Sequence, residues 1–140
     1  MNPADVYLQN MVENANPLRL VVMLYDKAIS CVDEALEAME TGLSEVENIK
    51  RKAENLTKVM DILIVLKASL DEEKGQEIAK NLDEIYSALI DEIVRINMVN
   101  DIDGLKKVRE ALVELRDAWE EAERNVYKKE ATVQTDGEKL

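Results

Sequence analysis

The sequence predicts an all-α protein, an antiparallel up-down four-helix bundle, and three observations predict it. Only four Gly and two Pro occur in 140 residues, and good helix formers fill most other positions. Apolar residues recur in steps of three and four along four segments of roughly 25 residues each, the spacing of one helix face. The breaks between these segments are short, so consecutive helices are expected to run antiparallel.

Residues 17–128 are expected to form this bundle as one domain. Asn16 followed by Pro17 opens the first helix, because Asn caps helices and Pro fits the first helical position. Ser44 with Glu47 three residues later predicts a capping box at the start of the second helix. The breaks between helices fall at Thr41-Gly42, between Leu70-Asp71 and Lys74-Gly75, and at Asn100-Asp101, where Asp101 is the expected cap of the fourth helix.

Each predicted helix carries one stripe of apolar residues that is expected to face the core. In the last stripe Trp119 lies in step with Leu112 and Leu115, so we expect a structural role for its indole. The stripes are Leu18, Val21, Val22, Tyr25, Ile29, Val32, Leu36 and Met39; Leu43, Val46, Ile49, Ala53, Leu56, Met60, Leu63 and Leu70; Ile78, Leu82, Ile85, Leu89, Ile93 and Ile96; and Leu105, Val108, Leu112, Leu115, Trp119, Ala122 and Val126.

Both ends of the chain are expected to lie outside the bundle. Residues 1–16 hold too few apolar residues to form a stable helix alone, and we expect a movable segment that docks on the bundle. Residues 129–140 are polar and lack a helical period of apolar residues, which predicts a disordered tail. The apolar residues of the first segment are Tyr7, Leu8, Met11 and Val12.

Composition and charge argue against several classes of function. With 30 acidic and 18 basic residues the net charge is −12, which disfavours binding to nucleic acid or to an anionic membrane. The absence of His removes the commonest general base and zinc ligand, and with it the di-iron pattern of helical bundles. The single Cys31 has no disulfide partner. Without a targeting segment or an apolar run of about 18 residues, we expect a cytoplasmic protein that is no enzyme and needs no metal or cofactor.

The apolar residues exceed what one core needs, and the surplus also recurs at helical spacing. A second apolar face left in water would be larger than most soluble monomers tolerate. It predicts either wide stripes that fill a thick core or pack the N-terminal segment, or a groove for an amphipathic partner helix. Periodicity alone does not choose between these alternatives. The surplus residues are Leu20 and Met23 on the first helix, Ile64 and Val65 on the second, and Ile90, Val94 and Met98 on the third.

Three stretches carry a resemblance to a known family. They are Tyr7-x-x-Asn10 with Pro17 and Leu24-Tyr25-Asp26-x-Ala28-Ile29; Leu70-Asp71-x-Glu73-Lys74-Gly75-x-x-Ile78-Ala79-x-Asn81-Leu82 with Tyr86; and Asn97-x-x-Asn100-Asp101 with Leu115-Arg116-x-Ala118-Trp119. In this order and spacing, over residues 7–119, the sequence resembles the FliS-type flagellar export chaperones. Gln76 stands where a second Gly is common in that family. Because Gln suits a helix interior better than Gly, we expect the fold to be undisturbed.

The resemblance implies a cytoplasmic chaperone that binds the C-terminal helical region of flagellin, prevents premature polymerisation and delivers flagellin to the flagellar type III export apparatus. It implies no catalysis. A self-associating structural bundle without a client stays open as the alternative, and so does a weak homodimer of the chaperone. The predicted client-binding residues are Tyr7, Asn10, Leu20, Met23, Ile64, Val65, Ile90, Val94 and Met98.

Overall fold

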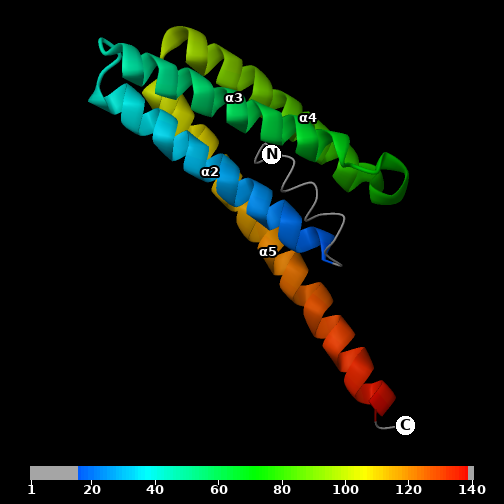
Figure 1. The fold of residues 1–140 in the computed structure, drawn as a ribbon. Coiled ribbons are helices and arrows are strands. Elements are labelled where there is room, and N and C mark those ends of the chain that lie inside the picture. The colour runs from blue at the N-terminus through cyan, green and yellow to red at the C-terminus, as the bar shows by residue number, and fades with distance from the viewer. Residues whose placement is uncertain (1–15, 139–140) are drawn as a thin grey trace, which may run out of the picture.

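The computed structural model describes residues 16–138, which form four helices and contain no strand (Figure 1). The helices are α2 (Pro17–Thr41), α3 (Val46–Ala68), α4 (Glu72–Val99) and α5 (Ile102–Glu138). α2 packs against α3 and α5, and α4 also packs against α3 and α5, so the helices close into a ring. This confirms the predicted all-α four-helix bundle.

Three helices begin at a capping side chain, and the sequence predicts two of these caps, Asn16 and Asp101, and a break at the third. The side chains of Asn16, Asp71 and Asp101 each accept a hydrogen bond from the backbone N–H three residues further on, at 3.2, 3.2 and 2.9 Å. These bonds satisfy N–H groups that have no partner within the helix. The predicted breaks and caps therefore place the starts of α2, α4 and α5 correctly.

The capping box predicted for the second helix is wrong. α3 begins at Val46, Glu45 occupies the cap position, and no side chain caps this end. The loop before α3 is held instead by the side-chain amide of Asn48, whose Nδ2 donates to the carbonyl oxygen of Gly42 at 2.9 Å. Gly42 has a φ of 128°, which a residue with a side chain rarely adopts, so the turn rather than the Ser44 hydroxyl sets where the helix starts.

The core lies between the four helices and consists mainly of the predicted stripes. Five residues of those stripes are exposed instead: Val46, Ile49, Ile78, Ile85 and Val126. A stripe indicates which side of a helix is apolar but not whether a neighbouring helix covers that side. Val46 and Ile49 lie in the first turn of α3 and are not covered. The largest fully buried residues are Tyr25, Tyr86, Leu20, Leu56, Leu63, Ile93, Ile96, Leu105 and Leu112.

The helix α5 continues to Glu138, where the sequence predicts a disordered tail from residue 129. Loss of the apolar period after residue 128 indicates the loss of packing partners. It does not indicate the loss of helix, because a helix can continue without an apolar stripe, and Lys129, Glu130 and Ala131 at the start of this stretch favour helical backbone. Figure 1 accordingly shows the end of α5 running past the other helices.

The start of α4 contains a kink at Gln76, whose backbone has φ 47° and ψ −123°. The predicted bundle forms, but the reason given for Gln76, that Gln suits a helix interior better than Gly, is wrong because this position is not helical. Positive φ favours Gly, and another residue type held there costs roughly 1–3 kcal/mol. The neighbouring Gly75 is required by space, since a Cβ there would lie 2.7 Å from the Cβ of Ala79.

Candidate functional site

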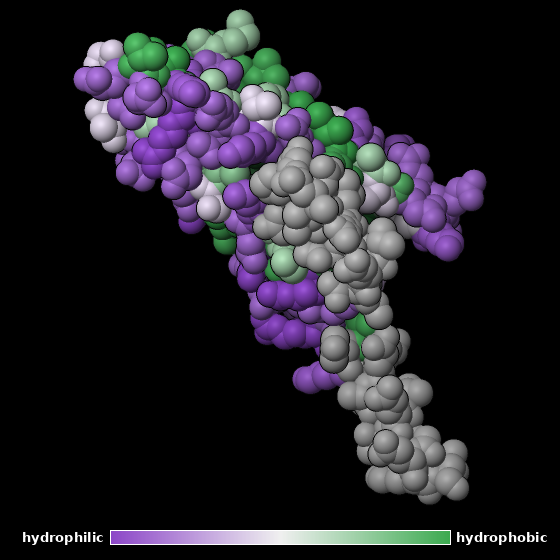
Figure 2. Space-filling view, viewed as in Figure 1, coloured by the Kyte–Doolittle hydropathy of each residue, from purple (hydrophilic) through white to green (hydrophobic). Residues whose placement is uncertain are grey.

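Exposed apolar side chains gather on the outer sides of α3 and α4. On α4, Ile90, Val94 and Met98 follow one another at four-residue spacing, which places them in one stripe. Val94 is 45% exposed and Met98 is 78% exposed. Figure 2 shows green apolar atoms along these two helices among purple hydrophilic ones. We call this surface the α3–α4 face, and it comprises Val46, Ile49, Ala53, Met60 and Ile64 of α3 with Ile90, Val94 and Met98 of α4.

A polar contact shows that the two stripes of this face adjoin. Lys67 lies seven residues after Met60 and so shares its side of α3, whereas Ser87 lies seven residues before Val94 and shares its side of α4. The Nζ of Lys67 donates to the Oγ of Ser87 at 2.8 Å and lies 3.8 Å from an oxygen of Asp83. Both stripes therefore border the same seam between α3 and α4.

Four of the five predicted client-binding residues on α3 and α4 belong to this face: Ile64, Ile90, Val94 and Met98. Ile64, Val94 and Met98 are exposed, so their predicted position off the core is confirmed. Ile90 is half-buried and packs against the core. Val65 also packs against the core, which corrects the expectation that it points away from it, and it lies on the side of α3 that carries Arg51 and faces α2. The structure therefore brings Ile64, Ile90, Val94 and Met98, but not Val65, to one region of the bundle.

The predicted client-binding residues of the first part of the chain do not join that region. Leu20 is 2% exposed, which corrects the expectation that it points away from the interior. It shares its side of α2 with Cys31 and Ala38, which are also buried, because α2 packs against two neighbours and buries a wide sector. Met23 is half-buried on α2. The predicted Tyr7 and Asn10 lie outside the described residues.

Two tyrosines from the motif stretches meet in the core across the bundle. The hydroxyl oxygens of Tyr25 on α2 and Tyr86 on α4 are 2.6 Å apart, and both residues are buried. Burial raises the pKa of both hydroxyls above the ordinary value, while a hydrogen bond with Trp119 acts in the opposite direction. Trp119 is half-buried and packs against the core, which agrees with its predicted structural role.

Lys52 is a buried charged residue that sequence reasoning missed. Only 7% of Lys52 is exposed, and its Nζ donates to the carbonyl oxygen of Asn97 at 3.1 Å and to Oδ1 of Asn100 at 2.5 Å. Lys52 lies four residues before Leu56, so it occupies a core position of α3. Its spacing from Leu56 could have indicated a buried position, but a stripe defined by apolar residues alone does not include a lysine.

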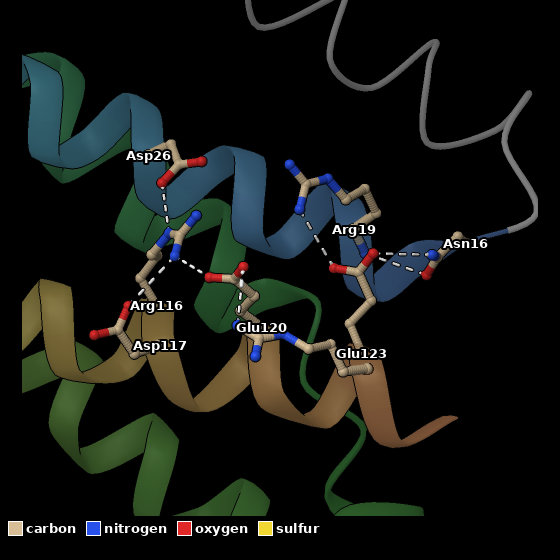
Figure 3. A network of polar contacts seen from close by, with 8 residues as sticks. Asn16, Arg19, Asp26, Arg116, Asp117, Glu120 and Glu123 are labelled. Carbon is tan, nitrogen blue, oxygen red and sulfur yellow. Dashed lines mark hydrogen bonds and ion pairs between the residues drawn. The ribbon is translucent and has the colours of Figure 1, made fainter. Parts of the chain in front are cut away.

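The opposite seam of the bundle is crossed by charged pairs. Among the described residues, four ion pairs join α2 to α5, and we call this region the α2–α5 seam. The hydrogen bond that Arg116 donates to Asp26 raises the pKa of the Arg116 guanidinium, and the hydrogen bond that Arg109 donates to Asp33 does the same for Arg109. Figure 3 shows the part nearest the start of α2, where Asn16 also donates to Glu123 at 3.3 Å. The pairs are Arg19–Glu123 at 3.6 Å, Asp26–Arg116 at 2.7 Å, Asp33–Arg109 at 2.6 Å and Glu40–Lys106 at 3.5 Å.

The described residues contain neither a candidate metal site nor a candidate membrane span. Within residues 16–138, His, Cys, Asp and Glu form no group of three or more that could hold a metal ion. In the same part of the chain, no helix combines the length and the apolar character needed to cross a membrane.

Comparison with known proteins gives one consistent family. The family model described as flagellar protein FliS matches residues 1–126. The flagellar secretion chaperone FliS of Salmonella typhimurium is 35% identical over 119 residues, which cover 84% of this chain and 84% of that protein. The FliS of Vibrio cholerae is 35% identical over 116 residues, covering 83% and 82%. The FliS of Bacillus subtilis is 31% identical over 121 residues, covering 86% of each.

Proposed function

This chain belongs to the FliS family of flagellar secretion chaperones, and from that premise we propose that its client is the C-terminal helical region of flagellin. In this proposal the chaperone acts in the cytoplasm without catalysing a reaction. It prevents premature polymerisation of flagellin and delivers it to the flagellar type III export apparatus. The observation that carries the proposal is the apolar α3–α4 face.

The dimensions of the α3–α4 face suit a helical client. On α3 the stripe extends from Val46 to Ile64, which at 1.5 Å per residue is about 27 Å, or about five helical turns. An amphipathic helix of that length could bury its own apolar stripe against the face. Met60 and Met98 are unbranched and flexible, so they can adapt to the shape of the bound side chains.

Binding to such a face would order a client segment that is unfolded when free. Ordering of this kind typically costs several kcal/mol, so the buried apolar area has to exceed that cost. Any interaction that holds the face in its binding geometry before the client arrives therefore increases affinity. The proposal predicts that single charges on the face have large effects on binding and small effects on folding.

The test is a titration of the purified flagellin C-terminal segment into two matched variants. Val94→Asp places a carboxylate on the α3–α4 face, whereas Val126→Asp makes the same change on α5 at nearly equal exposure, 45% against 44%. We expect Val94→Asp to weaken binding at least about tenfold, because the carboxylate must be desolvated, and Val126→Asp to stay within about twofold. Equal affinity of Val94→Asp and wild type, with both fully helical, would contradict the proposal.

A self-associating bundle without a client is the alternative, because a second copy could cover the same α3–α4 face. Sedimentation velocity of the free chain separates the two functions. The chaperone proposal predicts that Val94→Asp leaves the sedimentation coefficient of the free chain unchanged or shifts it only slightly, and that the wild-type chain binds the client. A tight dimer that Val94→Asp dissociates, combined with no binding of the flagellin segment, would support the alternative.

A further inference from the structure

Lys52 connects the two helices of the α3–α4 face from the core side. On α3 the next residue is Ala53, which lies on the face. On α4 the carbonyl acceptor belongs to Asn97, whose next residue is Met98, also on the face. The hydrogen bond from Lys52 to Asn97 therefore ties the backbone directly beneath Met98 to the turn of α3 that carries Ala53.

The chemistry of this contact explains why it can constrain the helices. A lysine stem is flexible and usually carries its ammonium group out to water. Here the residue is 7% exposed and its ammonium group donates to two protein acceptors, and loss of these bonds at a largely buried position is costly. The carbonyl groups of the last helical turn lack partners within the helix and carry partial negative charge, which attracts a cation. Separating α3 from α4 at this point would leave the Lys52 ammonium group and its acceptors on Asn97 and Asn100 without these hydrogen bonds.

Asn100 makes the acceptor site at the end of α4. It has φ 57° and ψ 46°, the left-handed conformation that Asn tolerates better than most residues, and it ends the helix there. Its Oδ1 accepts from Lys52 at 2.5 Å. Two residues of the motif Asn97-x-x-Asn100-Asp101 therefore hold one lysine, while the third caps α5.

The other end of the same seam is held more loosely. Lys67 reaches Ser87 at 2.8 Å and Asp83 at 3.8 Å, but its side chain is 41% exposed. Water can replace those contacts at little cost, and exposed pairs of this kind contribute little. Of these two polar contacts between α3 and α4, the one at the end where Ala53 and Met98 lie is therefore the stronger constraint on the spacing of the helices.

We propose that Lys52 is a positioning residue for client binding, which holds α4 at the distance from α3 at which Ala53, Val94 and Met98 receive one client helix. The inference rests on the proposed function, because the face has to bind a client for its spacing to matter. Lys52 itself lies beneath the face and need not touch the client.

Three variants test this role by titration with the flagellin C-terminal segment. Lys52→Met keeps the length of the side chain and removes its donors, and Asn100→Gly removes the Oδ1 acceptor while allowing the left-handed turn. Lys50→Met is the control, since Lys50 is exposed and contacts only Glu54, at 4.0 Å, in the pairs described. At a temperature where all are fully helical, we expect Kd to rise about tenfold for Lys52→Met, about threefold for Asn100→Gly and less than twofold for Lys50→Met.

A distance measurement distinguishes positioning from a merely structural role. In a Cys31→Ala background, spin labels at Glu54→Cys and at Val99→Cys, which is 61% exposed beside Asn100, report on the Lys52 end, and labels at Ala68→Cys and Glu84→Cys report on the Lys67 end. Lys52→Met should broaden or lengthen the first distance distribution in the free chain and leave the second unchanged. Unchanged distances at both ends, or unchanged affinity of Lys52→Met for a client that wild type binds, would overturn the inference. Failure of wild type to bind would contradict the proposed function instead, and the distances would still test whether Lys52 sets the spacing.

Discussion

The α2–α5 seam and the α3–α4 face belong to the same bundle but differ in the side chains on their outer surfaces. Across the α2–α5 seam, Arg19, Asp26, Asp33 and Glu40 recur every seven residues on α2, and each pairs with an opposite charge on α5. The α3–α4 face consists of apolar residues, five of which are exposed: Val46, Ile49, Ile64, Val94 and Met98. The comparison teaches that charged groups on one side of the bundle pair with each other, whereas the other side leaves apolar area exposed, where the proposed client would bind.

The order of charges on the α2–α5 seam also favours its observed register. A slip of one heptad in one direction would place Asp26 opposite Glu123, and a slip in the other would place Arg19 opposite Arg116. Like charges at such positions are unfavourable. The single reversed pair, Arg19–Glu123, therefore disfavours both slipped arrangements.

The largest expected effect comes from adjacent residues on α4 that belong to the core and to the α3–α4 face. Ile93 is fully buried and Val94 is 45% exposed. Ile93→Ala should lower the free energy of unfolding by about 2–5 kcal/mol through loss of burial and the cavity left behind. Val94→Ala should lower it by less than about 0.5 kcal/mol while weakening client binding. Urea unfolding measures both, and equal destabilisation by the two variants would break the distinction between core and face.

The tyrosine pair gives the next largest effect, because it joins α2 to α4 through the core beneath both regions. Tyr86→Phe leaves the Tyr25 hydroxyl without its partner and should lower the free energy of unfolding by about 1–3 kcal/mol. The same variant should leave client affinity within about twofold at low temperature, since Tyr86 is buried. A large loss of affinity without a loss of stability would place the pair in the binding site.

The tyrosine pair also predicts a pH dependence. Burial raises the pKa of the Tyr25 and Tyr86 hydroxyls above the ordinary value of 10.0. The unfolded chain then loses these protons at lower pH than the folded chain does. Their contribution to stability is complete below pH 10 and falls above it, by up to about 1.4 kcal/mol per pH unit for each tyrosine. Chemical unfolding between pH 9 and about 11 should show a shallower decline in the Tyr25→Phe, Tyr86→Phe double variant than in wild type.

Gln76 provides a smaller effect with the opposite sign. Because Gly adopts φ 47° without strain, Gln76→Gly should raise the free energy of unfolding by about 1 kcal/mol. Gln76→Ala keeps a Cβ and should bring no such gain. The kink lies at the start of α4, away from Val94 and Met98, so neither variant should change client affinity. Thermal unfolding of the pair checks the first expectation, and destabilisation by Gln76→Gly would mean that the Gln side chain compensates for its backbone.

The smallest expected effect belongs to a single pair of the α2–α5 seam. Asp33 and Arg109 are 2.6 Å apart but both side chains are more than 40% exposed, so water and salt screen them. Asp33→Asn should lower the free energy of unfolding by less than about 1 kcal/mol, and the difference from wild type should shrink further in about 1 M salt. A difference of several kcal/mol that persists in salt would show that the seam is a major source of stability.

The fold could be predicted from the sequence because each helix buries one side and because Asn16, Asp71 and Asp101 are typical caps. The exposure of residues at the ends of the stripes could not be predicted, since the exposure of Val46 or Ile78 depends on where a neighbouring helix ends. Periodicity of apolar residues also cannot show a kink that depends on backbone path. It therefore missed Gln76.

The candidate site was predictable in part. The four-residue spacing of Ile90, Val94 and Met98 indicates an outer stripe, and Val94 and Met98 are exposed as expected. Leu20 was misplaced because the width of the buried sector on α2 depends on its two neighbours. Lys52 was missed because a charged side chain at a core position becomes meaningful only when its acceptors, far along the chain, are placed beside it.

Oxidation of Met98 by hydroxyl radicals, read by mass spectrometry with and without a saturating flagellin C-terminal segment, tests most directly whether the client binds on the α3–α4 face. Met98 is 78% exposed in the free chain, so it should be oxidised readily to the sulfoxide. Bound client should protect Met98 several-fold, while side chains of the α2–α5 seam react as before. Equal oxidation of Met98 in the free and the client-bound chain would contradict the account.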